Sequence, residues 1–309
     1  MYRTLRNILF TLCFLSLCPG TFAGSITVPN SSFETPSAPN VSPYAGPDMD
    51  SWQKTAQPYW YNPTNGPWDQ VMGEFFNLPY PGYFIDNVDG YQASFLFALP
   101  GAGIFQDYDS IGGTNTVPTH DFNAIYQPGK TYSMTAGFIG EGGGMLEGVT
   151  EDMVLYFRDG SNNMVPIATY SVTNSTNTFP NRTHLVDFTV ATPVVKATDP
   201  WAGKHIGIEI VSSVSFAQIG GYWDVDNVRL VETTIPQISS PSHNKNGQFS
   251  FNLLSEPGLS FQLLTTTNVS TALTNWSTLA TVTNTTGVLP VTDTVNTNSS
   301  IRFYTAKQL

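Results

Sequence analysis

The densest group of side chains that could recognise a ligand lies between residues 57 and 84, where nine aromatic residues are interspersed with five prolines. Prolines interrupt helices and sheet ladders, so this segment is predicted to be a long loop over one end or face of the fold. Tyr59, Trp60 and Trp68 could pack against the C–H-rich face of a sugar while nearby polar side chains bind its hydroxyl groups. The alternative is that these rings pin the loop to the fold as a small satellite core. Trp201, in a turn before a strand pattern, is a fourth candidate that could equally close one end of the fold.

A second group that could do chemistry is acidic. Glu141, Glu147, Glu151 and Asp152 lie close together in a segment that begins with a run of glycines. Two carboxyl groups at a defined separation could supply the acid and the base of a glycosidase. The alternatives are a solvated acidic loop or a cation site. The four histidines are scattered without zinc-site spacing, and no Gly-x-Ser-x-Gly elbow is present, so the sequence offers no compact hydrolytic motif.

Composition excludes some classes of partner. The 309 residues carry a net charge of −11, and only 11% of them are charged. A nucleic-acid partner is excluded because phosphate binding requires a basic face. Hydrophobic residues make up 40% of the chain, which favours folded domains with sizeable cores over disorder.

Residues 1–23 have the pattern of a secretory signal peptide. Arg3 and Arg6 precede an apolar run, and Ala23 ends a stretch that is typical of a cleavage site. The run is too short to cross a bilayer as a mature helix, so no membrane span is predicted. Cleavage after Ala23 would remove both cysteines, so the exported chain is expected to have no disulfide. We therefore expect secretion or retention at the cell surface.

Short apolar or alternating runs separated by turn residues predict an all-β chain. Met153–Arg158 is apolar on both faces, which is typical of an inner strand of a sandwich. The strands predicted for the first domain are 93–99, 131–138, 153–158, 165–172, 184–190, 205–211 and 222–231. Residues 233–247 contain prolines and few large apolar side chains, which predicts a linker. The strands predicted after it are 249–254, 260–266, 276–282 and 301–305.

Several segments of the first domain carry a family pattern. The relevant stretches are Val28–Glu34, Asp89–Phe95, Gly103–Asp107, Tyr126–Ser133 and Gly221–Leu230. In this order and spacing they resemble galactose-binding-like jelly-roll domains, the fold of many carbohydrate-binding modules. The resemblance implies a jelly-roll β-sandwich over residues 24–232.

The same resemblance implies a structural calcium ion. In such domains an acidic residue near the start and an aspartate in the last strand often hold calcium, and the matching positions are Glu34 and Asp226. Strand alternation places Asp226 on the face of Val228 and Leu230, so it is expected to point inward and to need a partner. The alternative is that both carboxylates accept backbone N–H groups at strand ends.

Residues 248–309 resemble a C-terminal β-module of exported proteins of environmental bacteria. Among the matching residues are Asn275-Trp276 and the terminal Arg302-Phe303-Tyr304. A small fibronectin- or immunoglobulin-like β-sandwich is expected here, as a spacer, a surface-attachment element or an accessory domain.

Together these features predict an exported, non-catalytic protein that binds a polysaccharide or a cell-surface glycan weakly through Tyr59, Trp60, Trp68 and Trp201. One alternative is a structural or adhesive cell-surface protein, and the other is a polysaccharide-degrading enzyme on a jelly-roll scaffold.

Overall fold

The computed structural model describes residues 23–79, 84–109, 120–243, 248–294 and 301–309. The chain forms two compact units, and the boundary between them in the sequence lies between Glu232 and Thr233. Each unit has its own hydrophobic core. The predicted signal peptide, apart from Ala23, lies outside the described residues.

In the described part of the first unit, seven strands form one sheet. In spatial order they are β10 (Val186–Ala191), β7 (Lys130–Gly142), β12 (Tyr222–Thr234), β5 (Gln92–Phe97), β4 (Met72–Phe76) and β2 (Ala45–Gly46), with β1 (Ala23–Ile26) paired to β12. The pairs β10–β7, β12–β5, β5–β4 and β4–β2 run antiparallel.

Five strands form the second sheet among the residues that the structure describes. In order they are β3 (Gln53–Lys54), β6 (Gly103–Gln106), β11 (Gly207–Ser212), β8 (Thr150–Arg158) and β9 (Met164–Thr173). Every neighbouring pair in it is antiparallel.

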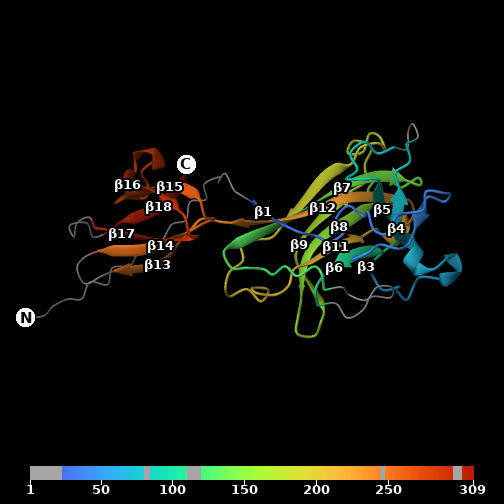
Figure 1. Ribbon diagram of the computed structural model, residues 1–309, viewed down its shortest axis with the longest axis horizontal. Helices are drawn as coiled ribbons and strands as arrows, with labels where there is room; N and C mark the ends of the chain where they lie inside the picture. Colours follow the sequence, from blue (N-terminus) through green and yellow to red (C-terminus); the bar gives the residue numbers. More distant parts are fainter. Residues whose placement is uncertain (1–22, 80–83, 110–119, 244–247, 295–300) are drawn as a thin grey trace, which may run out of the picture. The chain divides into compact units, whose positions relative to one another are not determined.

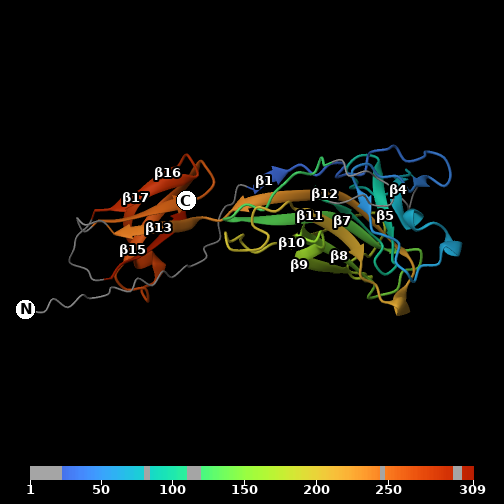
Figure 2. The same ribbon diagram turned by 90° about the horizontal axis from the view of Figure 1, so that it is seen from below.

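The two sheets are the layers of a β-sandwich (Figures 1 and 2). Leu96 and Trp223 from the first sheet and Leu155 and Ile208 from the second belong to one buried cluster. Burial of both apolar faces against one another is what makes such a two-layer fold stable. The fold class predicted from the sequence, an all-β jelly-roll sandwich, is confirmed.

The inner-strand prediction for Met153–Arg158 is also correct. The segment belongs to β8, which lies between β11 and β9, and residues 153–157 are all buried. Each of the other six strands predicted for this unit overlaps a strand of the structure. The sequence did not predict β1, β2, β3, β4 or β6, of which β2 and β3 are only two residues long.

Helical structure is confined to short 3₁₀ turns in the part of the chain that is described. They are η1 (Pro63–Asn65), η2 (Trp68–Val71), η3 (Phe216–Gln218) and η4 (Leu273–Asn275). Over the same residues no helix has the length and apolar character needed to cross a membrane.

The second unit is a small all-β domain with two sheets of three strands each within its described residues. One sheet has the order β13 (Gln237–His243), β14 (Phe249–Leu254), β17 (Val288–Asp293), and the other has β16 (Ser277–Asn284), β15 (Leu259–Thr266), β18 (Phe303–Gln308). Phe251 and Leu253 from the first sheet pack with Phe261 and Leu263 from the second.

The linker predicted at 233–247 needs correction. β12 extends to Thr234, and Gln237–His243 form β13, which pairs with β14. Serine and proline dominate β13, so its sequence carries no apolar alternation. It is an edge strand held by ladder hydrogen bonds, where proline is tolerated.

The core of the second unit should respond to truncation independently of the first unit. Phe261 is fully buried, so Phe261→Ala is expected to cost about 3–5 kcal/mol of that unit's stability. Calorimetry should show one transition moved down in temperature while the transition of the first unit stays in place. The neighbouring Gln262→Ala, on the other face of β15, is the matched control. Equal shifts for both variants would contradict this core assignment.

Candidate functional site

One hollow of the first unit lies against one face of the seven-stranded sheet. Its volume is about 460 Å³, within the range of small-molecule sites. Strands β5, β12 and β4 provide Phe95, Phe97, Tyr222, Asp224, Phe75 and Phe76, and the segments around them provide Pro43, Tyr44, Ala45, Leu78, Ile85 and Arg182. We call this hollow the aromatic groove.

Strand alternation explains why aromatic rings line this face. On β5, Leu96 is buried in the core, and Phe95 and Phe97 on either side of it point the other way. Phe97 pairs with Tyr222 across the ladder, and their rings lie 6.0 Å apart. Phe95 and Phe97 meet edge to face at 5.9 Å. The rings are therefore held by rigid strands.

Gly73 on β4 leaves room for this arrangement. A Cβ atom at this position would lie 2.1 Å from the Gly46 carbonyl oxygen and 2.9 Å from the Phe95 ring. Both contacts are shorter than atoms tolerate, so only glycine allows β2 and the Phe95 ring to approach here.

A buried ion pair forms one end of the aromatic groove. Arg182 Nη2 donates to Asp224 Oδ2 at 2.5 Å, and Nη1 donates to the Gly140 carbonyl oxygen at 3.0 Å. The guanidinium group also lies over the Tyr222 ring, 4.9 Å from its centre. Burial raises the pKa of Asp224 to about 7, and the charge of Arg182 acts in the opposite direction.

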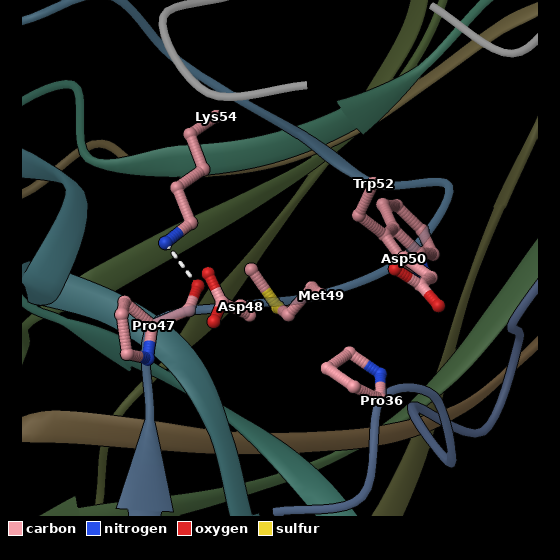
Figure 3. A pocket seen from close by; sticks show the side chains of 7 residues that line it. All are labelled: Pro36, Pro47, Asp48, Met49, Asp50, Trp52 and Lys54. Carbon is pink, nitrogen blue, oxygen red and sulfur yellow. Dashed lines mark hydrogen bonds between the residues drawn. The ribbon is translucent and has the colours of Figure 1, made fainter. Parts of the chain in front are cut away.

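A second, smaller hollow of about 240 Å³ is lined by acidic residues and one buried lysine. Its walls are Pro36, Pro47, Asp48, Met49, Asp50, Trp52 and Lys54 (Figure 3). Lys54 Nζ donates to the carbonyl oxygens of Pro47, Asp69 and Met72, the last at 2.9 Å. Burial lowers the pKa of Lys54 to about 8.

Glu74 on β4 belongs to the same electrostatic environment. It is only 1% exposed, and its Oε2 atom has no hydrogen-bond partner among the described residues. Burial, followed by the charges of Asp50 and Asp48, raises its pKa to about 8, while Lys54 acts in the opposite direction. The lysine is thus an internal counter-charge that is already engaged by three carbonyl groups.

The predicted aromatic loop is divided between surface and core. The Tyr59 side chain is 100% exposed, and Trp60 is half-buried with the exposed Phe216 ring against it at 5.2 Å. These three side chains form an exposed aromatic surface apart from the residues that line the groove.

Trp68 and Trp201 are not exposed platforms, which corrects that part of the prediction. Trp68 is 4% exposed, and its Nε1 donates to the Thr55 carbonyl oxygen at 2.7 Å. Trp201 is 8% exposed and packs edge to face on Tyr126. Both rings belong to the core cluster, as the satellite-core and plug alternatives anticipated.

Glu34 and Asp226 hold the same turn. Glu34 Oε1 accepts the backbone N–H groups of Tyr91 and Gln92 at 2.7 and 2.8 Å, and Asp226 Oδ2 accepts that of Asp89 at 2.7 Å. These hydrogen bonds match the alternative prediction that both carboxylates accept backbone N–H groups and need no metal ion. Asp226 Oδ1, however, is buried without a hydrogen-bond partner in the described structure. Burial raises the pKa of Asp226 to about 8, and the charges of Asp89 and Glu34 add to this effect.

Strand alternation alone, from which the sequence analysis predicted that Asp226 points inward, does not explain the burial of Asp226. Val225 and Val228 are both in the core although they are three positions apart, which strict alternation forbids. Asn227 between them has a φ of +56°. The strand therefore changes phase at Asp226 and Asn227, in the manner of a bulge.

Three carboxylates of the acidic cluster accept hydrogen bonds within the fold, and the fourth, Glu151, is fully buried in β8, where burial raises its pKa. Glu141 accepts from the Asn174 side chain at 3.0 Å, Glu147 from the Thr176 backbone at 2.9 Å, and Asp152 from Ser171 at 2.6 Å. In the described residues no group of three or more His, Cys, Asp or Glu side chains is arranged to hold a metal ion.

Comparisons with known proteins give distant structural matches. No family model matches this chain, and no curated protein matches it. Among solved structures, a Stig cyclase, Fisc from Fischerella sp. TAU, in complex with an indole compound is 20% identical, covers 68% of this chain and 98% of its own, and has a TM-score of 0.47. The CBM22-1 xylan-binding domain of Paenibacillus barcinonensis Xyn10C is 8% identical, with coverages of 60% and 86% and a TM-score of 0.32. A family 16 carbohydrate-binding module is 16% identical, with coverages of 59% and 91% and a TM-score of 0.29.

The buried carboxyl groups predict that stability falls as the pH rises. The folded-state pKa values of Glu74 and Asp226 are raised to about 8, whereas unfolded carboxyl groups titrate near 4. Between these values the folded state holds more protons, so the free energy of unfolding decreases from about pH 4 to about pH 8. Melting temperatures measured in chelator at pH 5, 6, 7 and 8 should therefore decline.

Glu74→Gln is the matched variant for this measurement because it keeps the shape and removes the titration. Its melting temperature should depend less on pH than that of the wild type. A melting temperature that rises from pH 5 to pH 8 would contradict the raised pKa values.

Proposed function

We propose that the first unit is a non-catalytic carbohydrate-binding domain that holds a sugar residue of a polysaccharide or cell-surface glycan in the aromatic groove. The observation that carries this proposal is a hollow with aromatic walls on rigid strands and a hydrogen-bonding ion pair at one end. Fold alone would not support a function, because one fold hosts many.

The chemistry of the groove matches that of a sugar ring. The C–H face of a pyranose would pack on Phe95 and Phe97, and its hydroxyl groups would reach Arg182 and Asp224 at the polar end. Arg182 has donors left after its two bonds, since a guanidinium carries five N–H groups. The groove is open and a sugar gives up many bonds to water, so weak binding is expected.

The exposed aromatic surface of Tyr59, Trp60 and Phe216 provides a further contact for an extended chain. Tyr59 and Phe216 are exposed and Trp60 is half-buried, and Tyr59 and Trp60 belong to the segment that the sequence predicts as the binding loop. A polysaccharide long enough to reach both places would be bound more tightly than a single residue. The secretory pattern of residues 1–23 supports export to where such glycans occur.

A second candidate function follows from Asp224. Its pKa of about 7 would keep part of the population protonated at neutral pH, and it lines the groove. A buried acid beside a bound ligand could donate a proton to it. Incubation of bound glycans with wild type and with Asp224→Asn, followed by chromatography, distinguishes binding from turnover. Product that appears with wild type and is lost in the variant would favour the enzyme.

The binding proposal predicts a loss of affinity when the groove loses a ring. Phe97 is 39% exposed, so Phe97→Ala removes a wall of the groove at little cost to the core. Affinity electrophoresis on xylan, mannan, galactan and cellulose derivatives should show about tenfold weaker binding to the polysaccharide that retains the wild type.

Tyr59→Ala compares the two surfaces, because it removes a ring of the exposed aromatic surface and leaves the groove unchanged, and it should cost less affinity than Phe97→Ala. A larger loss for Tyr59→Ala than for Phe97→Ala would move the site to the loop. Wild-type protein that no polysaccharide retards would overturn the binding proposal.

We further propose that Glu34 and Asp226 contribute to a structural calcium site. The unpartnered Asp226 Oδ1, and the negative charges of Asp89 and Glu34 that help to raise the pKa of Asp226, support the proposal. Calcium prefers six to eight oxygen ligands, so backbone carbonyl groups and water would complete the set. A bound cation would offset the repulsion among these carboxylates and stabilise the turn that they hold.

Calcium binding predicts a change in thermal stability. At pH 8, chelation should lower the melting temperature of the wild type by about 5 °C or more, and added calcium should restore it. Asp226→Asn should melt at the same temperature with and without calcium. A wild-type melting temperature that ignores both chelator and calcium would contradict this site.

A further inference from the structure

The aromatic groove changes in polarity from one end to the other. β12 contributes Tyr222 and Asp224, and Arg182 lies over the Tyr222 ring. At the opposite end, around β4 and β2, the lining consists of Phe75, Phe76, Leu78, Ala45, Pro43 and Tyr44, whereas Ile85 packs against Ile139 of β7. Both charged residues of the lining are thus at the β12 end.

The sheet order fixes the length of this gradient. β12, β5 and β4 are consecutive neighbours, so the two ends are separated by about two strand spacings, or about 10 Å. This length accommodates one pyranose ring over the Phe95 and Phe97 rings of β5, together with one substituent. The ring's polar edge would face Arg182, and the substituent would extend over β4.

From this gradient we infer that the aromatic groove selects sugars that carry an apolar substituent, such as an O-acetyl, O-methyl or deoxy group, over their fully hydroxylated forms. The inference rests on the proposed carbohydrate binding and adds the class of ligand.

The physical reason is the cost of an unpaired hydroxyl group. A hydroxyl placed among Phe75, Phe76 and Leu78 would lose its bonds to water and gain none from these side chains. An acetyl or methyl group at the same place would bury apolar surface favourably. Sites built from apolar side chains discriminate in this way, by leaving the wrong ligand unsatisfied.

The test compares polysaccharides that differ only in this substituent. O-acetylated xylan and O-acetylated glucomannan are each measured beside their saponified forms by affinity electrophoresis with the full-length mature chain. We expect at least one acetylated polymer to bind about tenfold or more tightly than its saponified form.

Leu78→Asn is the decisive variant because it supplies a hydrogen-bond partner at the apolar end. It should reduce the ratio of the two affinities toward one, chiefly by improving binding of the saponified polymer. Phe97→Ala is the matched control, since it removes a ring wall shared by both forms and should weaken both without changing their ratio.

Each outcome separates this inference from the proposal on which it rests. Equal binding of both forms, or tighter binding of the saponified form, would overturn the inference and leave carbohydrate binding intact. A preference that is unchanged in Leu78→Asn would show that the apolar end does not set it, and would also overturn the inference. Absence of binding to every polymer would overturn the proposed function itself.

Discussion

The pairing of β5 with β12 is the constraint on which the rest of the first unit depends. In this one ladder Leu96 lies opposite Trp223 on the core face, whereas Phe97 lies opposite Tyr222 and Phe95 opposite Asp224 on the other face. A slip of one residue would exchange the two faces. The same register therefore buries the core and assembles the aromatic groove, so a register that failed to form the groove would also expose Trp223. Stability and site geometry are joined in a single pair of strands.

The buried charges of this unit oppose that stability. Glu74, Asp224 and Asp226 are all nearly or fully buried, and desolvation raises the pKa of each. Arg182 compensates Asp224 directly, but Lys54 is committed to three carbonyl groups and relieves Glu74 only at a distance. The described residues contain no cysteine, and buried carboxyl groups add little to stability unless protons or a cation neutralise them. Among these three residues only Asp224 lines a hollow described above, so the proposed binding role concerns Asp224 alone.

The sequence predicted the parts of the fold that are determined by the pattern of a few neighbouring residues. Long apolar or alternating strands such as β8 were found because their pattern is contained in a few neighbouring residues. The two-residue strands β2 and β3 have no period to detect, and β13 lacks apolar alternation altogether. Asp226 was expected to be inward from a simple alternation, whereas the φ of +56° at Asn227 breaks it. The aromatic groove was missed for a different reason: it depends on the register between strands far apart in the sequence, although the apolar character of both faces of residues 93–99 was a visible signal.

Trp68 and Trp201 are buried in the core, which shows why rings that line a groove are more easily held on strands than on a proline-rich loop. A loop without regular structure must be held by its own side chains, and Trp68 does this by packing into the core and bonding the Thr55 carbonyl oxygen. A ring that anchors a loop has its faces covered and offers none to a ligand. On β5 the backbone is already held by ladder hydrogen bonds to β4 and β12, so Phe95 and Phe97 are not needed as anchors. Their faces are consequently free to line the groove, which is where the proposed binding surface lies.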